Sequence, residues 1–200
     1  MDNLNNLDCL CKVLNCHGFE AEVFPDKDLV AKRIFKMVRG HSVGYGGSMT
    51  LRSLGIIDKL GDYAGRVFSH LPGGAGEDER NALTADFYLT SANAVSMDGQ
   101  IVNIDGTGNR VSATCFGPRR IIYVIGKNKV VNDLDDALAW AKYAAVRLAK
   151  YYKRKTPCVK TGKCENCFSP DSICSITTIH RKKPSGIDVS VFLVDEELGI

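Results

Sequence analysis

The sequence has no long apolar run and no strong excess of either charge. Its longest apolar candidate, residues 121–126, is strand-sized, whereas a membrane span needs roughly 18 consecutive apolar residues. Lys and Arg number 26 against 23 Asp and Glu, which gives a formal charge of +3 and no concentrated basic surface. The first residues, Met1 to Asn6, lack the basic and apolar regions of a signal peptide. We therefore expect a cytoplasmic protein with no membrane span and no nucleic-acid partner.

The composition instead matches an ordinary folded domain. Hydrophobic residues make up 44% of the 200 residues and charged residues 24%, which excludes a disordered or collagen-like chain. Eight cysteines occur without a signal peptide, so we expect reduced thiols rather than a disulfide framework. The length favours one domain with a small appendage.

Short apolar runs alternate with helical patterns along most of the chain, and Asp26 or Asp28 and Asn132 or Asp133 could cap two of the helices. This alternation predicts an α/β fold with a mostly parallel twisted sheet, helices on both faces and a small Cys-rich C-terminal segment. We expect an α/β domain over residues 1–152, a four-cysteine segment over 153–186, and a final strand over 187–200 that returns to the domain. Expected helices cover 4–16, about 29–38, 77–85 and about 133–152, and expected strands cover 20–24, 66–70, 87–90, 101–104, 121–125 and 189–194.

Four cysteines with C-x5-C-x2-C-x6-C spacing form the sharpest motif: Cys158, Cys164, Cys167 and Cys174. Four thiolates within seventeen residues can converge on one soft metal centre. Tetrahedral zinc and an iron–sulfur cluster both fit this spacing. Two disulfides or four buried free thiols would explain the cysteines without a metal. We expect the other cysteines, at 9, 11, 16 and 115, and the scattered histidines, at 17, 41, 70 and 180, to be structural.

A glycine-rich turn lies between an expected strand and helix, at Gly44, Gly46, Gly47 and Ser48. Backbone N–H groups in such a turn can approach an anion, although a plain tight turn explains the glycines equally well. The turn matches neither the Walker A pattern nor a Rossmann fingerprint.

A polar run further along the chain contains a second group of candidate ligands. Asp98-Gly99 is typical of a hairpin turn. The stretch from Asp105 to Arg110 suits a loop that binds a polar or phosphorylated ligand, and an Asx turn with a surface arginine is the simpler alternative. The candidate ligand-binding residues of this stretch are Asp105, Gly106, Gly108, Asn109 and Arg110, and Asn93 and Asp98 lie earlier in the same polar run.

Six motifs in order resemble the LUD (lactate utilisation) domain family, whose fold is similar to that of the ribose-5-phosphate isomerase and CoA-transferase-like superfamily. They are Ser42-Val-Gly-Tyr-Gly-Gly-Ser48, Leu89-Thr-Ser-Ala-Asn-Ala94, Asp98-Gly-Gln-Ile-Val-Asn103, Asp105-Gly-Thr-Gly-Asn-Arg-Val111, Phe116-Gly-Pro-Arg-Arg120 and Val124-Ile-Gly-Lys-Asn128.

The resemblance implies a ligand cleft of glycine-rich loops at strand ends, in which the turn at residues 44–48 binds a phosphate or CoA-like group. It also implies an accessory role in oxidation of lactate or another 2-hydroxy acid, with iron–sulfur protein subunits as partners. The cysteine segment is similar to that of an iron–sulfur-related subgroup, so the resemblance favours a [4Fe-4S] cluster for electron transfer or assembly over zinc.

Two other functions remain open from the sequence. One is a metabolite-binding or regulatory module with a structural zinc. The other is an isomerase or acyl-transferase that uses Asp98 or Asp105 as its acid or base. Transferases of the superfamily commonly use a glutamate nucleophile, and residues 80–164 contain no glutamate.

Overall fold

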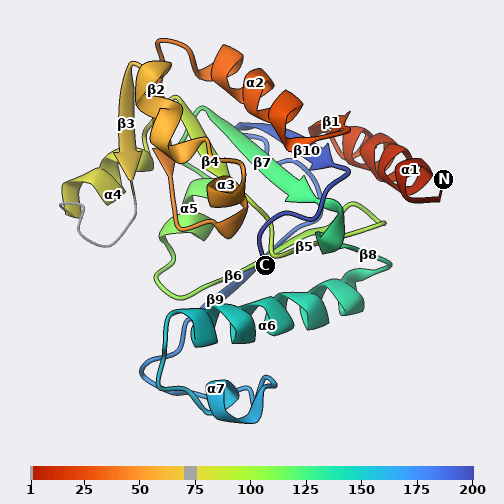
Figure 1. Cartoon of the computed structure of the whole chain (residues 1–200), viewed down its shortest axis with the longest axis vertical. Coiled ribbons are helices and arrows are strands. Elements are labelled where there is room, and N and C mark those ends of the chain that lie inside the picture. Colours follow the sequence, from red (N-terminus) through yellow and green to blue (C-terminus); the bar gives the residue numbers. More distant parts are fainter. Residues whose placement is uncertain (1, 70–75) are drawn as a thin grey trace.

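A parallel six-stranded sheet forms the centre of the molecule. The computed structural model describes residues 2–69 and 76–200 (Figure 1). The strands lie in the order β1-β10-β7-β4-β2-β3, and each neighbouring pair is parallel. Their bounds are β1 Glu20–Phe24, β2 Ser42–Tyr45, β3 Arg66–Ser69, β4 Phe87–Thr90, β7 Arg120–Gly126 and β10 Asp188–Val194.

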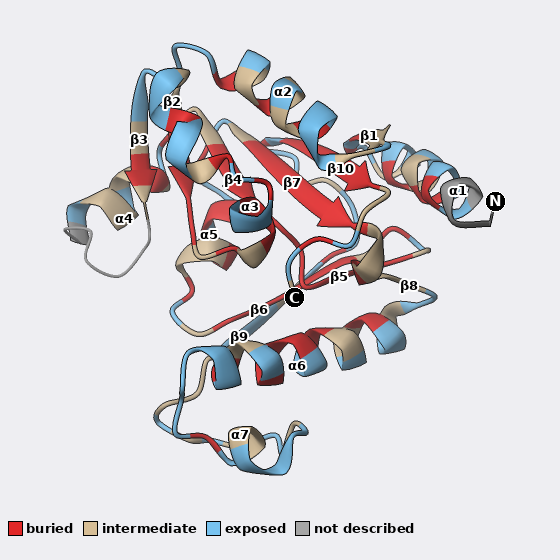
Figure 2. Ribbon diagram, in the orientation of Figure 1, coloured by how far each residue is buried: buried red, intermediate tan, exposed pale blue. Residues whose placement is uncertain are grey.

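Both faces of this sheet are covered, and the central strands β7 and β10 are buried at every residue after the first (Figure 2). Alternate β7 residues point to opposite faces: Ile121 and Ile125 join one apolar cluster, and Ile122 and Val124 join the other. The α/β fold with a mostly parallel sheet is thereby confirmed. The helices of this layer are α1 Asp2–Cys16, α2 Lys27–Val38, α3 Met49–Ser53, α4 Gly76–Ala82 and α5 Asn109–Cys115, with 3-10 turns η1 Ile57–Asp62 and η2 Lys127–Lys129.

A second, four-stranded sheet covers part of the face on which α1 lies. Its order is β8-β5-β6-β9, and β6 is antiparallel to both of its neighbours. The Asp98-Gly99 turn joins β5 to β6, with Gly99 at φ 75°. The sequence analysis did not separate this sheet from the main one. Its strands are β5 Ala94–Ser96, β6 Ile101–Asp105, β8 Val130–Val131 and β9 Ile176–His180.

Helix α6, Leu134–Tyr151, packs on the outer face of the second sheet. The Asp133 side chain caps it by accepting a hydrogen bond from Asp136 N. Alanines 137, 141 and 145 recur every four residues and are buried against Ala94, Val102 and Ile104. The short helix α7, Pro157–Thr161, lies beyond α6 at the edge of the molecule (Figure 1).

The predicted caps and most predicted elements agree with the structure. The Asp26 side chain caps α2 by accepting a hydrogen bond from Leu29 N, so Asp26 rather than Asp28 is the cap. His70, the last residue of an expected strand, and the loop residues 73–75 lie outside the described residues. Within the described ranges, no helix is long and apolar enough to cross a bilayer.

Candidate functional site

A cleft of about 250 Å³ opens at the carboxyl edge of the main sheet. Segments that follow β2, β4, β7 and β10 reach it, and the last turns of α6 form the opposite wall. This edge is where open α/β sheets generally bind ligands. The lining residues are Gly47, Ser48, Met49, Arg52, Ser91, Ala92, Asn93, Ile104, Asp105, Gly106, Thr107, Asn109, Arg110, Lys129, Ala145, Leu148, Tyr152, Arg154, Ile173 and Ile200.

The turn after β2 contains glycines at positions where neighbouring groups leave no room for a side chain. A Cβ on Gly46 would lie 2.7 Å from Arg110 Cγ and 2.8 Å from the Tyr88 hydroxyl. A Cβ on Gly44 would lie 2.7 Å from the carbonyl oxygen of Ala82. Neither glycine lines the cleft, whereas Gly47 does. The close approach at Gly46 therefore explains how Arg110 can lie over this turn.

Asp105 organises the loop that follows β6. Its Oδ1 accepts hydrogen bonds from the N–H groups of Thr107 and Gly108, both at 2.9 Å, which is the Asx turn expected as the simpler alternative. Its Oδ2 lies 2.9 Å from Arg110 Nε, and Arg110 Nη2 donates to the Ile104 carbonyl at 2.7 Å. The carboxylate is only 4% exposed, so this pair fixes the guanidinium at the cleft wall.

Asn93 connects the two strand ends that flank the cleft. Its Oδ1 accepts from Ile104 N at 2.9 Å, and its N–H donates to Asn103 Oδ1 at 3.2 Å. These bonds hold the segment after β4 against β6. Asn109 accepts from Arg110 N through its Oδ1.

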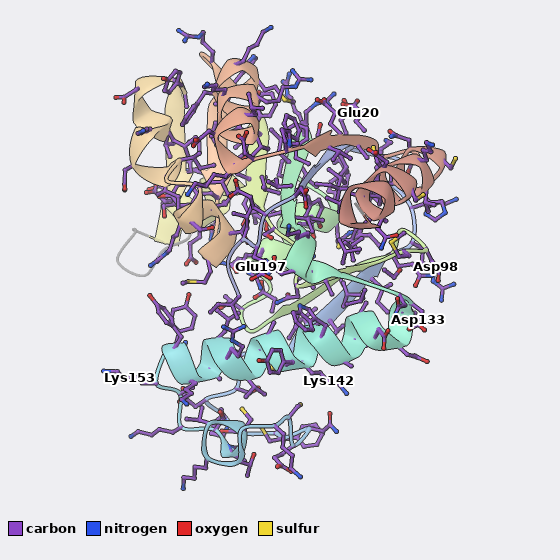
Figure 3. The ribbon with its side chains drawn as sticks, turned by 45° about the vertical axis from the view of Figure 1, so that its right-hand side comes forward. Glu20, Asp98, Asp133, Lys142, Lys153 and Glu197 are labelled. Atoms are coloured by element: carbon purple, nitrogen blue, oxygen red, sulfur yellow. The ribbon has the colours of Figure 1, made fainter. Side chains whose placement is uncertain are left out.

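Asp98 does not belong to the cleft. It occupies the β5–β6 turn, beside Gly99, where a Cβ would lie 3.0 Å from Nδ1 of His17, the residue that follows α1. Figure 3 shows Asp98 on the same side of the molecule as Asp133, at the start of α6, and away from Lys153 at the other end of that helix. Gly108 also lies outside the cleft lining; it is the N-cap residue that precedes α5 and has φ 94°. An acid or base role for Asp98 in this cleft is therefore not supported.

Lys129 is the cleft residue that the sequence analysis missed. Its residue exposure is 4%, and Nζ donates to Thr50 Oγ1 at 2.8 Å, Ser91 Oγ at 3.0 Å and the Ala92 carbonyl at 3.1 Å. Burial, and secondarily the nearby Arg110 charge, lowers the pKa of Lys129 to about 7. The sequence feature that could have identified Lys129 is its position just after a buried strand. The family motif Val124-Ile-Gly-Lys-Asn128 ends one residue before it.

Positive charge dominates the cleft. Arg52, Arg110, Lys129 and Arg154 all line it, and Asp105 has the one carboxylate side chain among the lining residues. Arg154 pairs with Asp171 at 3.1 Å, and Asp105 pairs with Arg110. Arg52 and Lys129 have no carboxylate partner in the described part of the chain. The unbalanced cations suit an anion.

The cysteine segment, residues 153–175, adjoins the cleft. Ile173 lines the cleft, and a Cβ on Gly106 would lie 2.9 Å from Ile173 Cα. Ser175 N donates to the Asp105 carbonyl at 2.9 Å. The sequence placed residues 176–180 within the four-cysteine segment, whereas the structure includes them in the second sheet as β9.

The four thiols of the cysteine segment lie near one another without a common ligand geometry. Partial desolvation raises the pKa of Cys174, and the charges of Cys164, Cys158 and Cys167 add to that rise. Cys158 Sγ lies 3.1 Å from Thr156 Oγ1, and Cys164 Sγ lies 3.8 Å from Asn166 Oδ1. Across residues 2–69 and 76–200, no group of three or more His, Cys, Asp or Glu side chains is arranged to hold a metal ion.

Comparisons with known proteins agree with this architecture. The structure is similar to the crystal structure of a DUF162 family protein from Deinococcus radiodurans, with a TM-score of 0.54 and 13% sequence identity, over 97% of this chain and 99% of that chain. This likeness concerns the fold. No curated protein matches the sequence significantly. The family model described as LUD domain matches residues 9–194. Since that match spans nearly the whole sequence, the chain belongs to the LUD domain family, which is associated with lactate utilisation.

Proposed function

We propose that the chain is an accessory protein of lactate or 2-hydroxy-acid utilisation that binds a small anionic ligand in its cleft. We further propose that its four cysteines hold an iron–sulfur centre for electron transfer or assembly. Lys129 carries the first part of the proposal, because a buried amine with no carboxylate partner faces a cleft that also contains Arg52 and Arg110. Membership of the LUD domain family supports the pathway.

An anion in the cleft would offset the free-energy cost of burying the Lys129 ammonium. A buried ammonium without a counter-ion favours its neutral form, and an anionic ligand nearby favours the charged form. Arg110 Nε and Nη2 contact Asp105 and the Ile104 carbonyl, and the remaining N–H groups of the guanidinium would give a carboxylate or phosphate a charge-assisted hydrogen bond. The apolar wall of Ala145, Leu148 and Ile173 would contact the uncharged part of the ligand. A small carboxylate or phosphate ester suits a cleft of about 250 Å³.

The donor set of the cysteine segment suits a soft metal centre. Cys158, Cys164, Cys167 and Cys174 would supply four thiolates, and the charges of the other three raise the pKa of Cys174, which supports their proximity to it. A [4Fe-4S] cluster supplies one-electron transfer when bound. Oxidation of a 2-hydroxy acid to a 2-oxo acid releases two electrons and two protons, so iron–sulfur partner subunits would carry the electrons onward.

Calorimetry with inorganic phosphate and L-lactate tests the cleft. Arg110→Ala should weaken binding by roughly 1–3 kcal/mol, because it removes a charge-assisted contact. Arg119→Ala is the matched control, since the Arg119 side chain is 86% exposed and lies outside the cleft lining. Equal affinity of wild type and Arg110→Ala for both probes would rule out this anion site.

Metal and acid-labile sulfide content of anaerobically purified protein tests the cysteine centre. About four iron and four sulfide per chain, lost in Cys164→Ser and retained in Cys9→Ser, is the result expected for a [4Fe-4S] cluster. One colourless zinc per chain would instead favour a metabolite-binding or regulatory module with a structural zinc. Neither metal in stoichiometric amount would overturn both assignments.

A further inference from the structure

Cys115 and His180 form a thiol–imidazole pair outside the cleft. Cys115 ends α5 and is exposed, whereas His180 ends β9 and is 9% exposed. Cys115 Sγ lies 3.7 Å from His180 Nε2. Neither residue lines the cleft. The sequence predicted a structural role for each, and nothing in their separation of 65 residues indicated that they meet.

The surroundings keep the imidazole available as a proton acceptor. Burial lowers the pKa of His180, and a hydrogen bond to the Thr114 backbone acts in the opposite direction. The imidazole is therefore mainly neutral near pH 7. Its Nδ1 is also buried.

Tyr123 adds a second buried polar group beside this pair. Its ring lies edge-on to that of His180, with centroids 6.4 Å apart, and its residue exposure is 1%. The Tyr123 hydroxyl is also buried, near the side chains of Thr114 and Asn103. Burial raises the pKa of this phenol, and the nearby Cys115 contributes to the rise. The phenol therefore remains protonated and can donate a hydrogen bond.

Three other thiols are exposed among the described residues, and Cys9 and Cys16 are the two that lie outside the cysteine segment. Cys9 and Cys16 lie on α1, and both are exposed. Neither has an imidazole within hydrogen-bonding distance in the described ranges. Exposure alone therefore does not distinguish Cys115 from Cys9 and Cys16, whereas the His180 contact does.

We propose that Cys115 is a hydroperoxide-reactive thiol and that His180 takes its proton. Sγ attacks one oxygen of hydrogen peroxide, so an S–O bond forms and the O–O bond breaks. The thiol proton passes to His180 Nε2 and then to the departing hydroxide, which leaves as water. The sulfur loses two electrons and becomes a sulfenic acid, and the peroxide is reduced. This modification site is independent of the proposed cleft function.

Peptide mapping of the intact chain after brief treatment with hydrogen peroxide and dimedone tests the proposal. Dimedone labels sulfenic acids, so the labelling rates of Cys115, Cys9 and Cys16 can be compared within one sample. Cys115 should label about tenfold faster than either reference thiol, in line with a positioned base. Equal rates at the three thiols would overturn the proposal without any variant.

Two histidine variants sharpen the test. His180→Gln retains a polar side chain but cannot serve as a base, so labelling of Cys115 should fall about tenfold while Cys9 and Cys16 are unchanged. His41→Gln, which removes an exposed imidazole elsewhere, should leave all three rates unchanged. Unchanged labelling of Cys115 in a folded His180→Gln protein would also overturn the proposal.

Discussion

The cleft and the cysteine segment adjoin one another but hold their polar groups in different ways. Lys129, Asp105 and Asn93 are each buried and bound by two or more partners from other parts of the chain or loop. The thiols of the cysteine segment are near one another, yet their described polar contacts are with neighbouring Thr156 and Asn166. The cleft is therefore preorganised by the fold, whereas the described residues do not hold the four thiols in a common ligand geometry.

The largest expected effect is a loss of anion affinity when the buried cation of the cleft, Lys129, is replaced. Lys129→Met should weaken phosphate binding by about 100-fold, or about 3 kcal/mol, because it removes a desolvated charge. The free energy of unfolding should change less, since burial of the unpaired ammonium is itself unfavourable. Calorimetry and urea unfolding measure the two effects.

Lys127→Met is the matched control for Lys129→Met. Lys127 lies two residues earlier, pairs with Asp195 at 3.0 Å and does not line the cleft. Its replacement should leave phosphate affinity unchanged. A similar loss of affinity in both variants would show that general charge, rather than the buried amine, binds the anion.

The next expected effect concerns the stability of the Asp105 loop. Asp105→Asn should lower the free energy of unfolding by about 2 kcal/mol, because Arg110 loses its buried counter-ion. Asp98→Asn, in the exposed turn at the other end of β6, should stay within about 0.5 kcal/mol of wild type. Urea unfolding of both variants tests this difference, and equal stabilities would contradict the assigned role of Asp105.

The pH dependence of binding provides a smaller, graded effect. Burial lowers the pKa of Lys129 from 10.5 to about 7, so the folded, ligand-free amine loses its proton above pH 7 while the unfolded chain retains it. This group therefore makes folding more favourable as pH rises from about 7 to about 10.5. Binding of an anion that needs the ammonium should show the opposite trend, with affinity falling by up to about tenfold per pH unit above 7.

Calorimetry in buffers of different ionisation enthalpy measures the accompanying proton uptake. We expect uptake of up to one proton per bound phosphate at pH 8 in wild type and none from this group in Lys129→Met. Phosphate itself titrates near neutral pH, so sulfate provides the comparison free of ligand titration. Identical proton uptake by both proteins with sulfate would contradict the assignment.

The smallest expected effect concerns the contact between the two regions. Gly106→Ala would place a Cβ against the Ile173 backbone, so we expect a loss of about 1 kcal/mol and faster amide exchange at residues 173–175. Gly61→Ala is the control, because its Cβ would meet no atom within 4 Å. Equal protection of the amides of residues 173–175 from exchange in both variants would show that this contact does not hold the cysteine segment.

Sequence patterns predicted the features of the fold that depend on neighbouring residues. The Asp133 cap and the alanine spacing of α6 are local, and so are the apolar run of β7 and the Asx turn at Asp105. Pairing among distant strands was not predictable in this way. The β6 strand has the composition of a buried parallel strand, yet the short turn at residues 97–100 makes it antiparallel to β5 in a separate sheet.

The candidate site was predictable to the extent that its residues occur in polar loops. Asp105 and Arg110 stood out because charge and glycine occur together there, and both line the cleft. Lys129 did not, because a lysine near the end of a strand is usually exposed and only the tertiary fold surrounds it with Thr50 and Ser91. Asp98 lies in a stretch with similar residue types, but the structure places it in the β5–β6 turn outside the cleft.

The place of β10 between β1 and β7 constrains the order in which the chain can be assembled during synthesis. Residues near position 20 pair with residues near position 190, and no direct β1–β7 pairing exists to precede that step. A ribosome-bound chain that ends before β10 leaves the apolar edge of β7 without its neighbour, which is a template for aggregation. Closure of the sheet is therefore a late event with a high contact order, and we expect slow folding that benefits from protection of the nascent chain.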